Sequence, residues 1–304
     1  MSQQCKIPKW ETEMKKIAPG VYAYIQAVGG WCISNAGLIV GEDYAIVVDS
    51  LTSVPLTQNF IKEIEKVTDK PVRYLINTHD HGDHIWANHL FKDASIVSSI
   101  ECREEIAKQD EYPDMSNFQK LLPHIDFKGV KNTIPDITFD SELCLYQKNR
   151  EVHLIHKGVG HTTGDTIVYL PKEGVMFAGD ILFIYGTPLC LTGSILGWIK
   201  YLDMMLGMDA KIFVPGHGPV CGKEAVIDVR EYLSIIYNEG RKRFDKGMTA
   251  AQAAKDIALG RFQDWSNWRR VAANVDRLFR EFRGERPADD LSEFIPEFFA
   301  KDQP

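Results

Sequence analysis

Two kinds of hydrophobic pattern divide the chain into a strand-rich part and a helical part. In the first part, short runs of β-branched and aromatic residues recur between turn residues, which is typical of buried strands. Residues 56–67 instead place apolar side chains at helical spacing before an apolar run over 71–77, so the order strand, helix, strand indicates a βαβ-like unit. The predicted strands cover residues 21–26, 33–41, 44–49, 71–77, 94–98, 137–139, 143–146, 151–156, 165–170, 174–178 and 212–214.

From residue 223 onward only helical periodicity is present. The segment 110–133 holds Pro113 and Pro123 and has no clear period, so it is expected to form a lid-like loop or a poorly patterned helical insert. We therefore predict an α/β (α+β) domain over residues 1–222 and a C-terminal helical extension over 223–304, which would serve as a cap or a dimer element. The predicted helices cover residues 56–67, 99–109, 194–208, 223–246, 249–259 and 268–282.

Composition and charge narrow the class of protein. A chain of 304 residues that is 44% hydrophobic and 25% charged can bury a core, which excludes disorder as its main state. The net charge of −7 counts against a nucleic-acid partner. We see no apolar run long enough for a membrane span and no secretory signal. The six cysteines form no C-x-x-C pair, so reduced thiols in a cytoplasmic protein are expected.

The segment that follows the predicted strand 71–77 is dense in metal-binding side chains. His79, His81, Asp83 and His84 lie within six positions, together with Asp80. On an extended chain His79 and His81 point to the same face, and a turn at Gly82 would direct Asp83 and His84 toward a second ion. Imidazole and carboxylate ligands suit zinc, iron or manganese. The alternative is a polar loop that happens to be rich in histidine.

Three later residues extend this cluster. His161, Asp180 and His217 each lie beside glycine next to a predicted strand, where the backbone can approach a ligand closely. Each signal alone is weak, because Asp180 could cap the next segment and His217 could be an ordinary turn residue. Together with the first cluster, however, they form a spaced set of histidines and aspartates.

This ordered set closely resembles the motifs of the metallo-β-lactamase superfamily over residues 17–220, and most of all its glyoxalase II and lactonase branch. The resemblance implies a four-layer αββα sandwich with the site at one edge of two sheets. It implies that His79, His81 and His161 bind one metal, that Asp83, His84 and His217 bind the other, and that Asp180 bridges both. Asp49 would orient a ligand loop without binding metal itself.

The activity that this resemblance implies is dinuclear, metal-dependent hydrolysis. A hydroxide bridging two divalent ions, with zinc favoured over iron or manganese, would attack the carbonyl of a small ester, thioester or lactone. Asp83 would relay a proton to the leaving group, and Tyr185 would donate a hydrogen bond to the oxyanion. The alternative is a mononuclear-iron persulfide dioxygenase on the same fold.

The sequence gives weaker signals for substrate contacts than for metal ligands. Trp31, Trp86, Phe183 and Tyr185 are candidates to line an apolar pocket, although core packing is the alternative for each. The basic positions 241–243 and 269–270 are expected to lie on solvated helix faces. The expected partner is a small-molecule substrate, with no nucleic acid and no membrane, and a homodimer is compatible with the helical extension.

Overall fold

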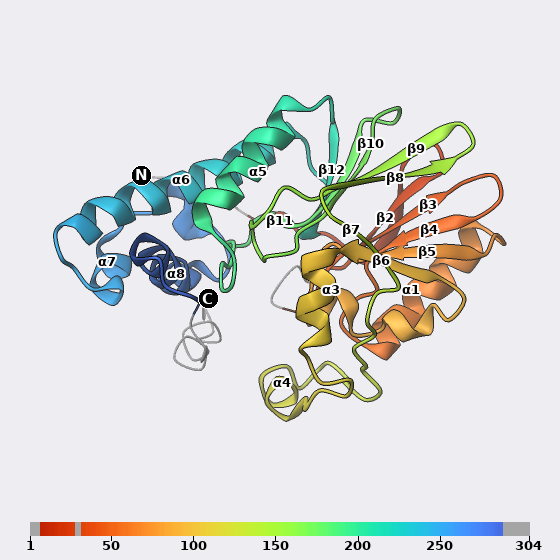
Figure 1. The fold of residues 1–304 in the computed structure, drawn as a ribbon, viewed down its shortest axis with the longest axis horizontal. Coiled ribbons are helices and arrows are strands. Elements are labelled where there is room, and N and C mark those ends of the chain that lie inside the picture. The colour runs from red at the N-terminus through yellow and green to blue at the C-terminus, as the bar shows by residue number, and fades with distance from the viewer. Residues whose placement is uncertain (1–6, 28–31, 288–304) are drawn as a thin grey trace.

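Two β-sheets pack face to face and carry helices on both outer sides (Figure 1). The computed structural model describes residues 7–27 and 32–287. The arrangement is the four-layer αββα sandwich, with further helices after the last strand, so the predicted fold class is confirmed.

The first sheet contains seven strands in the order of the sequence. Its first four strands pair antiparallel, and β4 to β7 pair parallel, so the carboxyl ends of β4, β5 and β6 meet at one edge. The strands are β1 (Glu13–Ala18), β2 (Val21–Ile25), β3 (Ala36–Val40), β4 (Ala45–Val48), β5 (Val72–Ile76), β6 (Ser95–Ser99) and β7 (Ile137–Phe139).

The second sheet contains five strands in the order β12-β11-β10-β9-β8. Only β11 and β12 pair parallel, which brings their carboxyl ends to the same edge of the sandwich as the site. The strands are β8 (Glu142–Gln147), β9 (Arg150–Ile155), β10 (Ile167–Leu170), β11 (Val175–Phe183) and β12 (Ile212–His217).

Helices cover the outer faces of both sheets and continue beyond the sandwich (Figure 1). The α-helices are α1 (Val54–Val67), α2 (Gly82–Ile85), α3 (Ile100–Ala107), α4 (Ser116–Leu121), α5 (Ile195–Gly207), α6 (Lys223–Asp245), α7 (Ala250–Asp256) and α8 (Val271–Arg283). Three 3-10 helices join them, η1 (Asn88–Leu90), η2 (Gly260–Asp264) and η3 (Trp268–Arg270).

Alternation along the strands explains why the sheets pack in this way. In β4, Ile46 and Val48 belong to the core between the sheets, whereas Ala45 and Val47 belong to the cluster that contains Phe60 of α1. Successive side chains of a strand point to opposite faces, so a fully apolar strand buries both of its faces. The site therefore stands on two rigid, closely packed sheets.

Two elements differ from the predicted ones for clear reasons. β1 was not predicted, because Glu13–Ala18 carries charges and lies half-exposed at an edge of the sheet. β11 was predicted to end at residue 178 but continues to Phe183, with every residue buried. Gly179 has the φ of a turn, 52°, and the register with β12 shifts around it, yet pairing with β12 resumes and carries the strand on to Phe183. Within 110–133 only the short helix α4 forms.

The helices after β12 are bound to the loop that follows β11. Asn274 of α8 is fully buried and donates to the carbonyl of Pro188 at 2.9 Å, while its Oδ1 accepts from the N–H of Cys190 at 2.8 Å. Its Nδ2 also lies 2.9 Å from the hydroxyl of Tyr232 in α6. This loop forms part of the wall of the site, so the helical extension helps to shape it.

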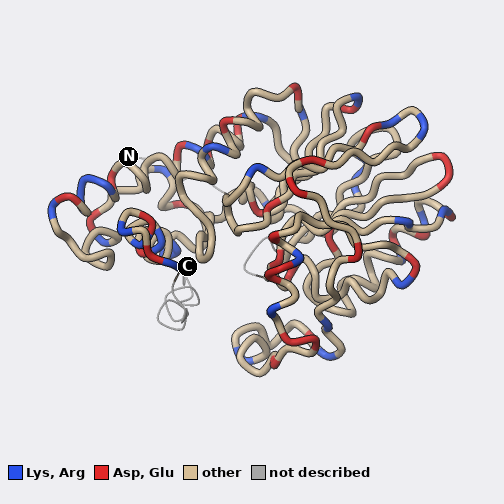
Figure 2. Tube along the Cα trace, viewed as in Figure 1, with Lys and Arg blue, Asp and Glu red and all other residues tan. Residues whose placement is uncertain are grey.

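The surface mixes both signs of charge, with Lys and Arg interspersed with Asp and Glu along the helices and outer loops (Figure 2). The described cysteines, all but Cys5, are free thiols, as predicted for these positions. Among residues 7–27 and 32–287, no helix combines the length and apolarity needed to cross a bilayer. The predictions about partners remain untested.

The hydrogen bonds of Asn274 generate a stability prediction. Asn274→Ala should lower the free energy of unfolding by about 2–4 kcal/mol, because it leaves buried backbone groups without partners. Chemical denaturation measures this change. Arg283→Ala at the exposed end of α8 is the control, and its effect should stay below about 0.5 kcal/mol. Equal effects of the two substitutions would contradict the assigned role of Asn274.

Candidate metal centre

The residues proposed as ligands converge at the edge where strand ends from both sheets meet. After β5 the chain bends over residues 78–80, His81 is extended with φ and ψ of −70° and 138°, and the short helix α2 begins at Gly82. The predicted turn at Gly82 is present, whereas the predicted extended segment before it is bent. His79, His81, Asp83 and His84 come from this segment, His161 from the turn between β9 and β10, Asp180 from within β11, and His217 from the end of β12.

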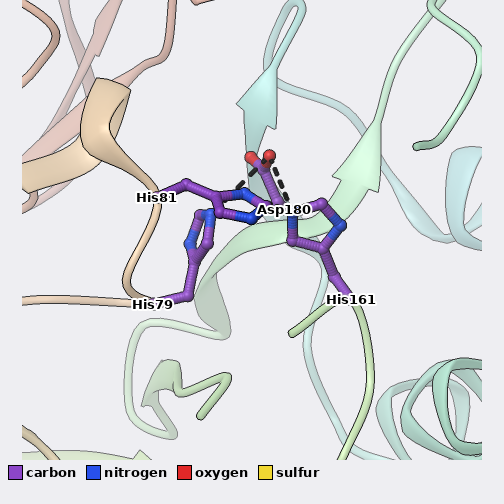
Figure 3. Close-up of side chains that lie close together, drawn as sticks. All are labelled: His79, His81, His161 and Asp180. Carbon is purple, nitrogen blue, oxygen red and sulfur yellow. Dashed lines mark hydrogen bonds and ion pairs between the residues drawn. The ribbon is translucent and has the colours of Figure 1, made fainter. Parts of the chain in front are cut away.

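The first group consists of His79, His81, His161 and Asp180, whose ligand atoms lie within 4.8 Å of one another. Figure 3 shows the three imidazole rings and the carboxylate of Asp180 gathered around a common point. Nε2 of His161 lies 2.9 Å from Nδ1 of His81 and 3.3 Å from Oδ2 of Asp180. Three nitrogens and one oxygen at this spacing match a tetrahedral zinc site.

The second group consists of Asp83, His84 and His217, again within 4.8 Å of one another. Nε2 of His217 lies 3.3 Å from Oδ2 of Asp83 and 3.3 Å from Oδ2 of Asp180. Nε2 of His84 lies 3.1 Å from Oδ1 of Asp180. Asp180 thus contacts both groups, and the two sets are those that the family resemblance implied.

Buried atoms without partners test whether these residues suit metal ions. Nε2 of His79 is buried without a hydrogen-bond partner, and Nε2 of His84 and Oδ1 of Asp180 are buried with no hydrogen bond of good geometry, although they lie 3.1 Å apart. Such orphaned atoms are rare in folded proteins and need an explanation such as an ion. All three face the cluster, and nitrogen with carboxylate oxygen is a donor set for zinc, iron or manganese. The residues therefore fit divalent metal.

Asp49 links the two groups by hydrogen bonds on the side of the rings that faces away from the cluster. Its Oδ2 lies 2.8 Å from Nδ1 of His84 and accepts the hydroxyl hydrogen of Thr78 at 2.7 Å. Because that hydroxyl donates to Asp49, it accepts from Nδ1 of His79, 3.0 Å away. Both histidines then carry a proton on Nδ1, which directs Nε2 toward the cluster as the position that a metal would take. The expected orienting role of Asp49 agrees with these contacts.

His217 is oriented in the same way by the backbone. Its Nδ1 lies 2.9 Å from the carbonyl oxygen of Ile33, which can only accept, so Nε2 is left to face Asp83 and Asp180. Ser34, the next residue, donates its hydroxyl to the carbonyl of Asp83 at 2.5 Å. The loop before β3 therefore positions two members of the second group.

Two glycines make room for the cluster. A Cβ at position 216 would lie 1.9 Å from Oδ1 of Asp180, and a Cβ at position 82 would lie 1.8 Å from the indole of Trp86. Any larger residue at these positions would displace the side chain it meets. The glycines beside the predicted ligands are thus required by close packing.

The electrostatics of the cluster separates its histidines. Burial lowers the pKa of His79, and lowers that of His161 to about 3, so both rings are neutral and keep a lone pair for a metal. Burial also lowers the pKa of His217. The carboxylates of Asp180 and Asp83 outweigh burial, however, and raise that pKa to about 9. Metal binding at the second group would therefore release protons.

A cavity of about 320 Å³ opens onto the cluster. Its walls are mostly apolar, and the predicted metal ligands lie at one side of it. Its size suits a small substrate. Two of the predicted substrate contacts, Trp86 and Phe183, line the cavity, and Asp83 also reaches it. The other lining residues are Cys32, His81, Gly82, Asn117, Phe118, Leu121, His161, Asp180, Leu189, Leu191, His217 and Arg270.

Two predicted substrate contacts are not placed in this cavity. Tyr185 is absent from its described lining, and its ring instead lies 6.3 Å from that of Trp10. The backbone carbonyl of Tyr185 accepts from the N–H of Ser266, which fixes the residue to the helical extension. Trp31 lies outside the described residues. The catalytic role of Tyr185 therefore gains no support from its position.

Arg270 was expected on a solvated helix face, but it lies at the cavity. It is only 3% exposed and lines the cavity, and its Nη1 is held by the carbonyl of Thr187 in the loop that follows β11. Phe118 and Leu121 of α4 were also missed, since 110–133 has no readable period. No local signal distinguishes Arg270 from Arg269, its half-buried neighbour.

A family model of the metallo-beta-lactamase superfamily matches residues 29–217, more than half of the chain. The chain therefore belongs to the metallo-beta-lactamase superfamily, whose members are metal-dependent hydrolases. The resemblance found in the sequence is confirmed at this level. Its narrower placement in the glyoxalase II and lactonase branch stays a prediction.

Individual relatives are distant and differ in activity. A linear primary-alkylsulfatase of Pseudomonas sp. (strain ATCC 19151) is 24% identical over 265 residues, which are 73% of this chain and 49% of that protein. A hydroxyacylglutathione hydrolase of Pelagibacter ubique (strain HTCC1062) is 27% identical over 157 residues, 50% of this chain and 52% of that protein. The solved structure of the sec-alkylsulfatase Pisa1 from Pseudomonas sp. superposes with a TM-score of 0.70 at 14% identity, covering 90% of this chain and 50% of that one. This chain thus spans about half the length of these relatives.

The contacts of Asp49 generate a prediction about metal affinity. In Asp49→Asn, an amide can turn its NH₂ toward Nδ1 of His84, which would move the ring proton onto Nε2. We expect metal affinity to fall by ~10–100-fold, the usual effect of losing such a partner. Titration against a competing chelator measures it. Asp203→Asn, at an exposed carboxylate on α5, should leave the affinity unchanged, and equal affinity in both variants would refute the role of Asp49.

Proposed function

We propose that this chain is a dinuclear metal-dependent hydrolase of ester-type bonds in a small, largely apolar substrate. The observation that carries the proposal is the position of Asp180, whose two oxygens face ring nitrogens of both groups. A carboxylate between two sets of ligands is the arrangement expected for two ions held side by side. Carbonyl esters, thioesters and lactones are the leading substrate classes.

The residues would divide the work as follows. His79, His81 and His161 would hold one ion, and Asp83, His84 and His217 the other, with Asp180 shared. When bound, two divalent ions acidify water and polarise the bond to be cleaved. Asp83 reaches the cavity, so its carboxylate is placed to pass a proton to the leaving oxygen or sulfur.

A covalent mechanism through a cysteine has less support. Cys32 lines the cavity, but burial, together with the carboxylates of Asp83 and Asp180, raises the pKa of its thiol well above the usual value. The thiolate, which is the nucleophilic form, is thus disfavoured at neutral pH. Water activated at the metal centre is the better candidate for attack.

Sulfate esters are a second candidate class. The superposition on the alkylsulfatase Pisa1 covers 90% of the chain, so it extends past residue 217, where the family model ends, into the helices that contribute Arg270. A shared fold does not establish a shared substrate. It does justify including alkyl and aryl sulfates among the compounds tested.

Metal content is the first test of the proposal. Protein purified without chelator or nickel should contain about two divalent ions per chain, and Asp180→Asn should retain fewer because both groups lose a shared ligand. Elemental analysis gives the counts. The half-exposed cluster of Cys144, Glu151 and His153 on β8 and β9 could also bind an ion, so His153→Ala serves as the control and should keep both central ions. One iron per chain and little zinc would instead favour the persulfide dioxygenase.

Activity is the second test. The metal-loaded protein should hydrolyse at least one of 4-nitrophenyl butyrate, a thioester, a γ-lactone or 4-nitrophenyl sulfate, and the rate should fall to near background after chelation. His81→Ala should lower kcat/KM by roughly a thousandfold or more, because removal of a metal ligand disables the centre. His153→Ala should keep full activity. Undiminished turnover in His81→Ala would exclude the proposed centre.

A further inference from the structure

Arg270 is a buried cation in a cavity that is otherwise apolar apart from the metal-binding cluster and Asn117. Its Nη1 donates to the carbonyl of Thr187 at 2.9 Å, and its Nε is buried without any partner. Within the described part of the chain, no carboxylate forms an ion pair with it. A buried guanidinium normally has such a partner, because an uncompensated charge is costly to desolvate.

A purely structural role does not explain the charge. Three residues of the extension, four positions apart, hold the loop after β11. The hydroxyl of Ser266 donates to the carbonyl of Tyr185, Arg270 donates to that of Thr187 and the amide of Asn274 donates to that of Pro188. Ser266 and Asn274 do this with neutral side chains. Holding a backbone carbonyl therefore requires a donor but no cation.

The guanidinium also lies close to the reacting centre. Its central carbon is 5.9 Å from the ring centroid of Phe183, and that ring stacks on His217 at 4.9 Å with an interplanar angle of 13°. Asp180 and Asp83 are near enough to oppose the effect of burial on Arg270, whose pKa is lowered to about 10, so it stays protonated at neutral pH. The charge therefore persists beside the cluster.

The charge balance of the cavity favours an anionic guest. If two divalent ions occupy the cluster, their charge exceeds that of the carboxylates of Asp83 and Asp180, and Arg270 adds to the excess. Among the described residues that line the cavity, only these two aspartates carry a negative charge. Even with the Asp49 carboxylate on His84 and a hydroxide at the ions, Arg270 adds a positive charge that an anionic ligand would balance.

We propose that Arg270 binds an anionic oxygen group of the substrate and selects anionic over neutral substrates. The planar, forked guanidinium suits a carboxylate, sulfate or sulfonate, and the apolar walls suit the alkyl or aryl remainder. This inference rests on the proposed hydrolase function and names its substrate class. The anion is either a carboxylate remote from the scissile bond or the sulfate of a sulfate ester, which share the same chemistry.

Equilibrium binding tests the proposal without turnover. Hexanesulfonate, which cannot be hydrolysed, and 1-hexanol share an alkyl chain and differ in the anionic group. In calorimetric titrations of the metal-loaded protein, Arg270→Met should weaken hexanesulfonate binding by about 10–100-fold, the effect of losing a charge-assisted hydrogen bond. Hexanol binding should change less than about twofold. Arg270→Lys should be intermediate, because it keeps the charge without the fork.

Arg269→Met is the matched control, one residue away and outside the described lining of the cavity. It should leave the affinities for both probes unchanged. If Arg270→Met weakens both probes equally, or neither, the proposal is overturned, since a structural defect would not distinguish the two. Thermal unfolding of each variant verifies that it is folded.

Paired substrates show which anion is recognised. For mono(4-nitrophenyl) succinate and 4-nitrophenyl butyrate, the ratio of kcat/KM values should fall by about tenfold or more in Arg270→Met, mainly through KM. A loss confined to 4-nitrophenyl sulfate would instead identify the scissile sulfate as the bound anion. Unchanged ratios with both esters and the sulfate would reject the proposal while the hydrolase function stands. Arg270-dependent sulfonate binding without any hydrolysis would reject the hydrolase and retain the anion site.

Discussion

The carboxylate of Asp49 is the interaction on which the arrangement of the site depends. It lies at the end of β4, in a left-handed backbone conformation with φ of 60°, and it is almost fully buried. From there it accepts from the backbone and hydroxyl of Thr78 and contacts the ring of His84. One carboxylate thereby fixes the ligand loop after β5 and the protonation of a histidine in each metal group. Strain of this kind at a non-glycine residue is commonly found at functional sites.

The two sheets fix the positions of the other candidate ligands. Residues that are far apart in the chain meet because β4 and β5 in one sheet, and β11 and β12 in the other, all end at the same edge. The core between the sheets holds that edge rigid, so seven candidate ligands can share one small volume. The helical extension then contributes Arg270 to the described lining of the cavity.

Much of this was accessible from the sequence because its signals are local. Alternation of apolar residues predicts a strand, and apolar residues three and four apart predict a helix. The spacing of His79, His81, Asp83 and His84 predicted an extended segment followed by a turn, and the chain adopts the turn at Gly82 after a bend over residues 78–80. The glycines beside His161, Asp180 and His217 marked places of close approach. Ordered motifs of this kind also sufficed to assign the superfamily.

What the tertiary structure alone decided concerns contacts between distant segments. The neighbouring strand β12 makes Gly179 and Asp180 part of a strand, although their local composition is that of a turn. The position of Tyr185 away from the cavity and that of Arg270 within it follow from how the extension packs on the loop after β11. Burial is a property of the whole fold, and an arginine at a helix start looks the same in sequence whether water or a cavity faces it. The sequence thus determined the elements and the chemistry of the metal-binding set, while packing decided which other side chains surround the substrate.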